Sequence, residues 1–246
     1  MDNLGTHAMG SPQWVKLIFS TGPVRNNKGH SKHTQYHQMF VPAMNTLMGG
    51  QGRNEAYALL VLQYLCVLGL IRRFKAQPFE TVEAEFGAEI TPDFLVELLD
   101  GRLLVVEIKS ERFITHALKQ IFDRNHERFA TFGMTYLVWT DKKPLNHAIR
   151  HHVIQMQRFS GEDIPRTEID ALAGFVTVRR SVSLSEIYEA GFDLGCLYAA
   201  AWEGKVFAPW CEEFHPETKV TPWQQEDLEA TFLDCKRSSN EWWDSL

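Results

Sequence analysis

Two apolar segments on either side of Asp100-Gly101 form the clearest pattern in this chain of 246 residues. Residues 94–98 and 103–108 are mainly apolar, and an Asp-Gly pair between such segments predicts a β-hairpin. The open end of the hairpin is different, because Thr91-Pro92-Asp93 precedes the first strand and Glu107-Ile108-Lys109 ends the second. Two carboxylates and a lysine are therefore expected at the ends of neighbouring strands.

The hairpin can pair in two registers. A two-residue loop sets Asp93 opposite Ile108 and turns its side chain away from Glu107. A three-residue loop over 99–101, with glycine in the left-handed conformation, or an equivalent bulge, sets Asp93 opposite Glu107. Because a slip of one residue moves every side chain to the other face, we prefer this second register, which separates polar from apolar residues. Lys109, two residues after Glu107, then shares its face.

Two carboxylates that face each other require a compensating cation. Directly opposed side chains have β-carbons roughly 4.5–5.5 Å apart. Two charges about 5 Å apart repel by roughly 3 kcal/mol at an effective dielectric of 20. A favourable cross-strand pair contributes only about 0.2–1 kcal/mol, so the cation is expected to be Lys109 or a divalent metal. The alternative is that Asp93 merely opens a strand and that Glu107 and Lys109 face solvent.

Helix and strand patterns surround this hairpin. The apolar run from Glu55 to Ile71 predicts a buried helix that is too short to span a membrane, and Glu55 in its first turn also suits the helix dipole. We expect a strand over 72–78, a helix over 113–127, a strand over 134–139 and a helix over 145–157. Histidines near these helices, among them His152, are expected to be exposed. The order predicts an α/β fold with a mixed sheet flanked by helices.

A smaller C-terminal domain is expected after a linker at 160–165. It should contain an extended stretch over 173–182, a helix that opens with the capping sequence 183–186, a helix over 194–202, and short strands near 206–208 and 218–220. Two short helices followed by a hairpin predict a winged-helix-like domain. Its local residues are acidic, which favours protein contact over base recognition.

The polar residues around the hairpin resemble the signature of the PD-(D/E)xK, or restriction-endonuclease-like, superfamily. The matching features lie within about 52–139 and are Asn54-Glu55, Gln77-Pro78, Thr91-Pro92-Asp93-Phe94 and Glu107-Ile108-Lys109. Within that superfamily the chain is most similar to the TnsA endonuclease subunits of heteromeric Tn-seven-type transposases.

This resemblance implies a magnesium-dependent endodeoxyribonuclease in which manganese can substitute. It implies that Glu55, Asp93, Glu107 and the backbone carbonyl of Ile108 bind the metal, and that Lys109 orients or activates the attacking water. Cleavage of the phosphodiester at the 5′ ends of a transposon by metal-activated water is the implied reaction. The implied partners are double-stranded DNA, a DDE-type (TnsB-like) transposase subunit and an AAA+ ATPase (TnsC-like) regulator.

Two other functions remain open at this point. The chain could be a free-standing nuclease of repair, phage or restriction type. It could also be a catalytically silent factor that assembles DNA ends, although Asp93, Glu107 and Lys109 together argue against a decayed site.

The charge distribution suggests where DNA would bind. The net charge of −6 does not favour DNA binding by bulk electrostatics, but residues 1–53 hold five basic residues and one acidic residue, a local net charge of +4. The candidate DNA contacts are Lys16, Arg25, Lys28, Lys32 and Arg53. A flexible, soluble extension is the alternative.

We therefore expect four regions along the chain. They are a basic extension over 1–50, a nuclease domain over 51–160, the winged-helix-like domain over 165–225, and an acidic tail over 226–246 that contains Trp242-Trp243. The four cysteines show no paired metal-ligand spacing, and the sequence shows no export signal. A bacterial, cytoplasmic location with no membrane contact is expected.

Overall fold

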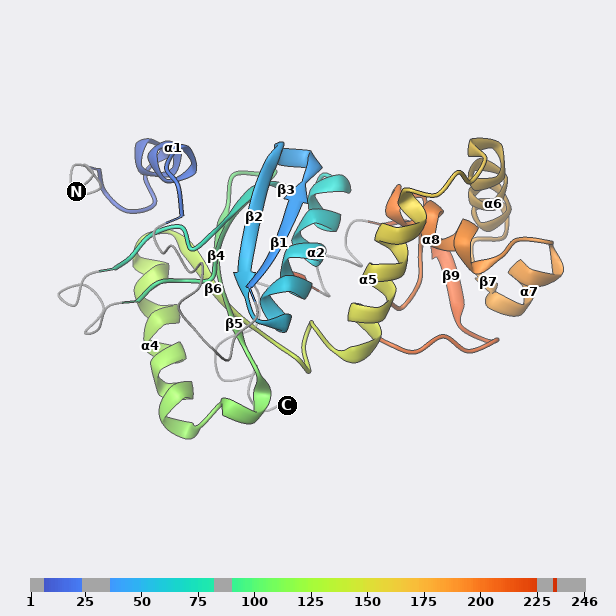
Figure 1. The fold of residues 1–246 in the computed structure, drawn as a ribbon. Helices are drawn as coiled ribbons and strands as arrows, with labels where there is room; N and C mark the ends of the chain where they lie inside the picture. Colours follow the sequence, from blue (N-terminus) through green and yellow to red (C-terminus); the bar gives the residue numbers. More distant parts are fainter. Residues whose placement is uncertain (1–6, 24–35, 82–89, 225–231, 234–246) are drawn as a thin grey trace. The chain divides into compact units, whose positions relative to one another are not determined.

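The computed structural model of the chain describes residues 7–23, 36–81, 90–224 and 232–233. It divides into two compact units. Of the described residues, those within 7–62 and 71–141 form the first unit, and those within 63–70 and 142–233 form the second. Within the described residues the chain forms seven α-helices, a four-stranded mixed sheet and smaller antiparallel sheets (Figure 1). The predicted mixed α/β class is confirmed at this level.

A four-stranded sheet forms the centre of the first unit. Its strands, in order across the sheet, are β3 (Ile71–Ala76), β4 (Phe94–Leu98), β5 (Leu103–Lys109) and β6 (Met134–Thr140). β4 runs antiparallel to both β3 and β5, whereas β5 and β6 are parallel. Helix α4 (His116–Thr131) connects β5 to β6 and supplies the crossover that a parallel pair requires.

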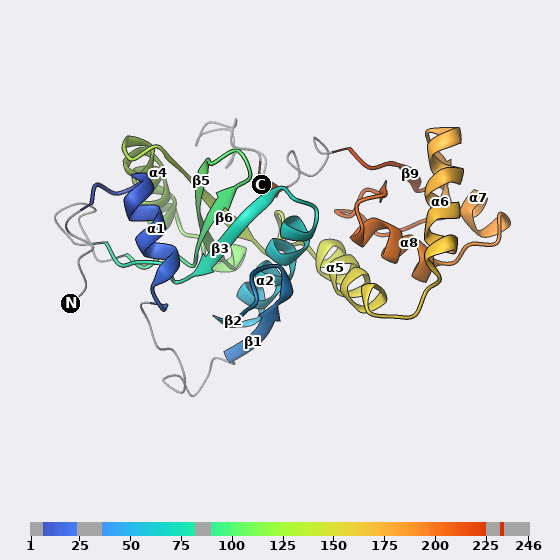
Figure 2. The same ribbon diagram turned by 90° about the horizontal axis from the view of Figure 1, so that it is seen from above.

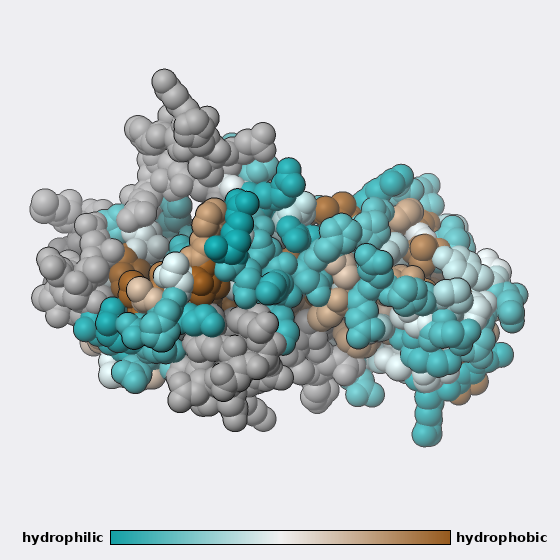
Figure 3. Space-filling model, turned by 90° about the horizontal axis from the view of Figure 1, so that it is seen from below, coloured by the Kyte–Doolittle hydropathy of each residue, from teal (hydrophilic) through white to brown (hydrophobic). Residues whose placement is uncertain are grey.

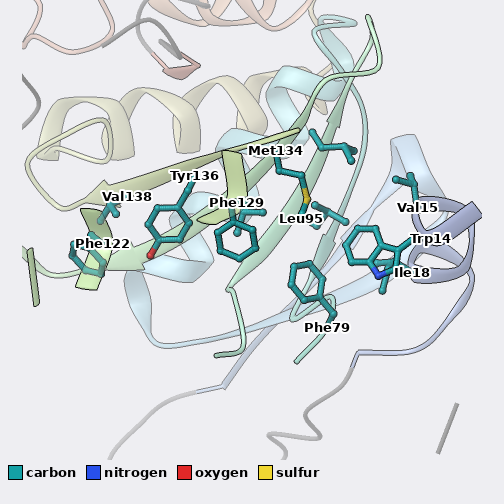
Figure 4. Packing of buried hydrophobic residues seen from close by; sticks show 12 residues of the cluster. Trp14, Val15, Ile18, Phe79, Leu95, Phe122, Phe129, Met134, Tyr136 and Val138 are labelled. Carbon is teal, nitrogen blue, oxygen red and sulfur yellow. The ribbon is translucent and has the colours of Figure 1, made fainter. Parts of the chain in front are cut away.

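Helices cover both faces of this sheet. Figure 2 shows α1 (Pro12–Ser20) and α4 on one side and α2 (Arg53–Val67) on the other. On the first side, Trp14 and Ile18 of α1 belong to one buried cluster with Leu95 of β4 and residues of α4, β5 and β6. Figure 4 shows the large side chains of this cluster from close by. The predicted separation into one polar and one apolar face therefore applies only at the open end of the hairpin.

Helix α1 is held to the sheet by a buried lysine. Lys75 on β3 is 7% exposed. Its ammonium group donates hydrogen bonds to the carbonyl of Ile18, to the carbonyl of Thr21 at 2.7 Å and to Thr21 Oγ1 at 2.8 Å. These oxygens lie at the end of α1, where helix carbonyls lack partners within the helix. Burial lowers the pKa of Lys75 to about 8.

The described part of the expected N-terminal extension is folded into the first unit. Besides α1, it contains a two-stranded ribbon of β1 (Tyr36–Val41) and β2 (Thr46–Gln51), joined through the short turn η2 (Pro42–Met44). The N–H of Phe74 on β3 lies 3.3 Å from the sulfur of Met44. Within the expected extension over 1–50, the described residues thus form a helix and a ribbon, and apolar side chains such as Trp14 belong to the core.

The second unit combines helices with a small sheet. Its helices are α5 (His147–Ser160), α6 (Arg166–Arg179), α7 (Leu184–Glu189) and α8 (Leu194–Trp202). The strands β7 (Val182–Ser183), β9 (Lys219–Pro222) and β8 (Val206–Phe207) pair antiparallel in that order. Ser183 and Glu186 form the predicted capping box, and α8 has the predicted bounds.

Two expectations for the second unit were wrong. The segment 173–179, expected to be extended, belongs to α6, in which Ile169, Leu172 and Val176 are buried at helical spacing. His152, expected to be exposed, is buried on α5 and stacks on Phe214 with 4.1 Å between ring centroids. Its ring nitrogens lie 2.9 Å from the hydroxyl of Tyr198 and 2.9 Å from the carbonyl of Glu212.

Helix α5 belongs to the second unit, although we expected it to close the nuclease domain. Its Asn146 N-cap donates to the carbonyl of Cys211, and Phe159 stacks on Tyr198 of α8. The expected tail at 226–246 lies outside the described residues apart from Phe232 and Leu233, which are buried. Of the helices described here, none has the length and apolar character needed to cross a membrane.

Candidate active site at the open end of the β4–β5 hairpin

The hairpin has the predicted three-residue loop. Leu95 pairs with Val105 and Glu97 with Leu103. At the closed end the Leu98 N–H donates to the carbonyl of Arg102 at 2.9 Å, and Gly101 has φ of 90°. The left-handed glycine therefore sets the register, as expected.

This register brings Asp93 and Glu107 to opposite positions. The count from Phe94 paired with Val106 sets Asp93 opposite Glu107 one residue further along. Hydrogen-bonded and non-hydrogen-bonded pairs alternate along an antiparallel ladder. Leu98 and Arg102 form a hydrogen-bonded pair, and pairs of the two kinds alternate from there along the hairpin. Asp93 and Glu107 therefore form a non-hydrogen-bonded pair, in which side chains approach most closely.

Pro92 changes how β5 ends. The next hydrogen-bonded position would join Ile108 to Pro92, but proline has no N–H to donate. The N–H of Ile108 donates instead to Oδ2 of Asp93 at 2.7 Å. Because the N–H and C=O of one strand residue point to the same side, the carbonyl of Ile108 also points toward the strand of Asp93. Because Pro92 has no N–H, it cannot donate the backbone hydrogen bond that the Ile108 carbonyl would accept from any other residue at this position.

Lys109 and Glu55 complete the group of predicted residues. Nζ of Lys109 lies 2.7 Å from Oε1 of Glu107, and the Glu107 side chain is only 12% exposed. Glu55 lies in the first turn of α2 and next to Gly50 of β2. A β-carbon on Gly50 would lie 2.8 Å from Cβ of Glu55, so glycine is required where the ribbon passes this helix.

The charges of these residues act on one another. Burial raises the pKa of Asp93 well above its usual value, and the charges of Glu107 and Glu55 raise it further. The hydrogen bond from Ile108 and the charge of Lys109 oppose this shift. The charges of both other carboxylates therefore act on Asp93.

Lys109 responds in the opposite sense. Burial lowers the pKa of Lys109, but the charge and hydrogen bond of Glu107, together with the charges of Asp93 and Glu55, outweigh burial. The net result is a raised pKa. Lys109 is consequently an ammonium ion at neutral pH.

Glu97 provides a contrast within the same strand. It lies four residues after Asp93 and so shares its face. Its carboxylate is nearly buried and is paired with Arg73 Nε at 2.6 Å and with Arg72 Nη1 at 3.6 Å. Two guanidinium groups thus pair with Glu97, whereas Glu107 at the open end of the hairpin pairs with the amine of Lys109.

Sequence reasoning missed a buried tyrosine beside the carboxylates. Tyr136 on β6 is 4% exposed and stacks on Phe129 of α4 with 5.6 Å between ring centroids. In Figure 4 both rings lie in the same cluster as Trp14. Burial raises the pKa of Tyr136 well above its usual value, the charge of Glu107 raises it further, and a hydrogen bond with Asn125 opposes the shift. Its sequence position indicated only a core aromatic residue.

Asp141 is a second residue that the sequence reasoning missed. It follows β6 directly and accepts hydrogen bonds from the hydroxyl of Ser110 at 2.6 Å and from the N–H of Glu111 at 2.8 Å. These donors follow Lys109 immediately. Because β5 and β6 are parallel, their C-terminal ends meet at one edge, and this rule could have identified Asp141.

Two of the five predicted DNA-binding residues lie among the described residues. Lys16 is exposed on α1, and Arg53 is exposed at the first position of α2, two residues before Glu55. Arg25, Lys28 and Lys32 lie outside the described residues.

The residues present can be tested against a magnesium ion. Within the ranges that the structure describes, no group of three or more histidine, cysteine, aspartate or glutamate side chains is arranged to hold a metal ion. Asp93, Glu107 and the Ile108 carbonyl are nevertheless hard oxygen donors that lie at the same open end of the hairpin. Magnesium retains several waters and commonly binds proteins through one or two carboxylates. The donor chemistry therefore fits this ion, with Glu55 as a nearby charge.

Comparisons with known proteins add no identity. No protein-family model matches the chain, and no curated protein matches it. The functional argument therefore depends on the site itself.

Proposed function

We propose that this protein is a metal-dependent DNA endonuclease with a PD-(D/E)xK, restriction-endonuclease-like site. More specifically, we propose a TnsA-like subunit of a Tn-seven-type transposase that cleaves the 5′ ends of the transposon. The observation that supports this most is the opposed pair of Asp93 and Glu107, with Lys109 bonded to Glu107 and Glu55 close enough to raise the pKa of Asp93.

The residues of the site have distinct proposed roles. Asp93, Glu107 and the carbonyl of Ile108 would hold Mg²⁺ or Mn²⁺, and Glu55 would add negative charge beside it. When bound, the ion supplies Lewis-acid activation of water and neutralises charge on the phosphate. These carboxylates repel one another, and Lys109 or a metal ion would offset that repulsion.

Lys109 would act as a cation and not as a proton acceptor. Its raised pKa means that it is an ammonium ion at neutral pH, and an ammonium ion cannot take a proton from water. It can donate a hydrogen bond that orients the attacking water, and it can stabilise charge that develops on the phosphate. Its contact with Glu107 fixes the ammonium at the edge of the carboxylate pair.

Cleavage of supercoiled plasmid by the purified full-length protein, alone and together with the proposed partner subunits, tests this function. Whichever mixture cuts, we expect cutting to require Mg²⁺ or Mn²⁺ and to be lost when this protein carries Asp93→Ala or Lys109→Ala. Asp100→Asn is the matched control, because Asp100 lies at the closed end of the same hairpin and is 52% exposed. Retained cleavage by the Asp93→Ala protein in magnesium buffer would refute the assignment.

The same assay separates the more specific functions. A TnsA-like subunit should be nearly silent alone and become active with a DDE-type, TnsB-like subunit and a TnsC-like AAA+ ATPase. Efficient cutting by the protein alone would indicate a free-standing nuclease. Absence of cutting both alone and with these partners would indicate a catalytically silent factor that assembles DNA ends.

A further inference from the structure

An exposed arginine–phenylalanine pair follows the candidate site directly. The short turn η3 (Glu111–Phe113) begins two residues after Lys109. Phe113 is 61% exposed, which is more than any other aromatic side chain of the described residues. The guanidinium carbon of Arg112 lies 4.5 Å from the centre of its ring. A flat apolar surface and a cation are thus presented together.

The turn is fixed to the end of the sheet. Asp141 accepts hydrogen bonds from Ser110 and from the N–H of Glu111, one on each carboxylate oxygen. Within the turn, the Phe113 N–H donates to the carbonyl of Ser110 at 2.9 Å, and the Ile114 N–H donates to the carbonyl of Glu111 at 3.0 Å. Exposure of Phe113 is therefore built into an anchored turn and does not result from a loose loop.

The ring lies within reach of DNA bound at the site. Four residues span at most about 14 Å, so the Cα atoms of Phe113 and Lys109 are no farther apart than this. One DNA strand advances about 3.4 Å per nucleotide, and 14 Å thus corresponds to roughly four nucleotides. A phosphate held beside Lys109 would have its neighbouring bases within this range.

We propose that the Arg112–Phe113 turn binds an unstacked base of the cleaved strand, next to the bond that is cut. This inference rests on the proposed nuclease function and specifies its substrate as DNA with an unpaired or distorted base. Phe113 would stack on the base, and Arg112 would contact the adjacent phosphate. Bases inside an intact duplex have both faces covered by their neighbours, so only an unstacked base can use this ring.

Nucleic acid suits this surface better than a protein partner does. Stable protein interfaces require broad, well-packed surfaces, whereas base stacking requires one ring and a nearby cation. On the face of the molecule seen in Figure 3, hydrophilic residues surround the apolar ones over most of the coloured surface. Arg112 also provides positive charge in a chain whose net charge is −6.

Binding to two DNA molecules tests the proposal. Both carry the same sequence with a fluorescent aminopurine, which is unpaired in a short bubble in one and fully paired in the other. The full-length protein is titrated in buffer with a chelator, so that no strand is cut. The variants are Phe113→Ala and Phe113→Trp, with Tyr188→Ala as control, because Tyr188 is 49% exposed and lies in the second unit.

We expect Phe113→Ala to weaken binding of the bubble DNA roughly five- to hundredfold and to affect the paired duplex far less. The aminopurine quenching that stacking causes should disappear with it, and Phe113→Trp should restore both signals. Tyr188→Ala should leave both affinities unchanged. Unchanged bubble binding in Phe113→Ala, or equal losses on both DNA molecules, would overturn the proposal.

The plasmid assay keeps this test separate from that of the proposed function. A Phe113 effect on bubble DNA without any dependence of cleavage on Asp93 would support the base contact and refute the nuclease. If cleavage depends on Asp93 but the affinity for bubble DNA is unchanged in Phe113→Ala, the base contact is refuted and the nuclease function is not. Circular dichroism of each variant verifies that it is folded.

Discussion

Replacing Asp93 by asparagine should abolish DNA cleavage and also make the first unit more stable at neutral pH. Asparagine keeps an oxygen that can accept the hydrogen bond from the N–H of Ile108, which Asp93 Oδ2 accepts at 2.7 Å. It removes the charge that faces Glu107 and lies near Glu55. The substitution would thus remove a proposed catalytic group and at the same time increase the free energy of unfolding of the first unit.

The size of this gain follows from the site. Two carboxylates at about 5 Å repel by roughly 3 kcal/mol at an effective dielectric of 20. Lys109, 2.7 Å from Glu107, offsets part of this repulsion. Exchanging a charged for a neutral acceptor of the Ile108 N–H costs about 1 kcal/mol. A net gain of about 1 kcal/mol remains, which corresponds to about 2–4 °C in the midpoint of thermal unfolding.

The gain should depend on pH in a defined direction. The pKa of Asp93 is raised in the folded protein, so between the unfolded value and the raised value the folded protein binds more protons. The free energy of unfolding of the wild-type protein therefore decreases as pH rises through this window. The asparagine variant has no titrating group at this position, so its stability does not show this decrease. The difference between the two proteins should be small near about pH 4 and largest above the raised pKa.

Thermal unfolding at several pH values, together with hydrogen exchange of the β4 and β5 amides, measures the effect. Added Mg²⁺ should stabilise the wild-type protein more than the variant, because a ligand stabilises the state that binds it. Asp100→Asn is the matched control and should show neither the gain nor the metal effect. A variant that is less stable than wild type by the same amount at every pH would show that Asp93 acts only as the acceptor for Ile108.

Two further substitutions test the backbone around the site. Pro92→Ala restores an N–H opposite Ile108 and should tie up its carbonyl, so we expect the Mg²⁺ concentration for half-maximal cleavage to rise about tenfold while the protein remains folded. Gly50→Ala places a β-carbon 2.8 Å from Cβ of Glu55 and should displace that side chain. We expect the cleavage rate of this variant to depend less steeply on Mg²⁺ concentration in the same assay. An unchanged Mg²⁺ titration of Pro92→Ala would contradict the role given to the Ile108 carbonyl, and an unchanged titration of Gly50→Ala would contradict the role given to Glu55.

The sequence predicted the hairpin correctly because several local signals agreed. Asp100-Gly101 defined the turn, the apolar alternation chose the register, and the register determined that Asp93 faces Glu107. The helix that Glu55 opens was also predicted from its apolar run, whereas the proposed place of Glu55 at the site came from the family resemblance.

Other features depend on contacts that no local pattern encodes. The valines and threonine of 173–179 favour a strand, but burial of Leu172 and Val176 against the second unit selects a helix. An amphipathic pattern shows that α5 has a buried face and does not show which residues it meets. Tyr136 likewise looks like any core aromatic until the parallel pairing of β5 and β6 sets it near Glu107.

The amine of Lys75 makes the leading helix an integral part of the protein. Removal of the residues up to Thr21 would take away all three oxygens that solvate this ammonium inside the fold. It would also take Trp14 and Ile18 out of the buried cluster that contains Leu95, the second residue of β4. Shortened versions that begin at the ribbon would therefore contain a buried ammonium without these partners and a sheet that has lost part of its apolar cover, so the smallest stably folded fragment has to start ahead of α1.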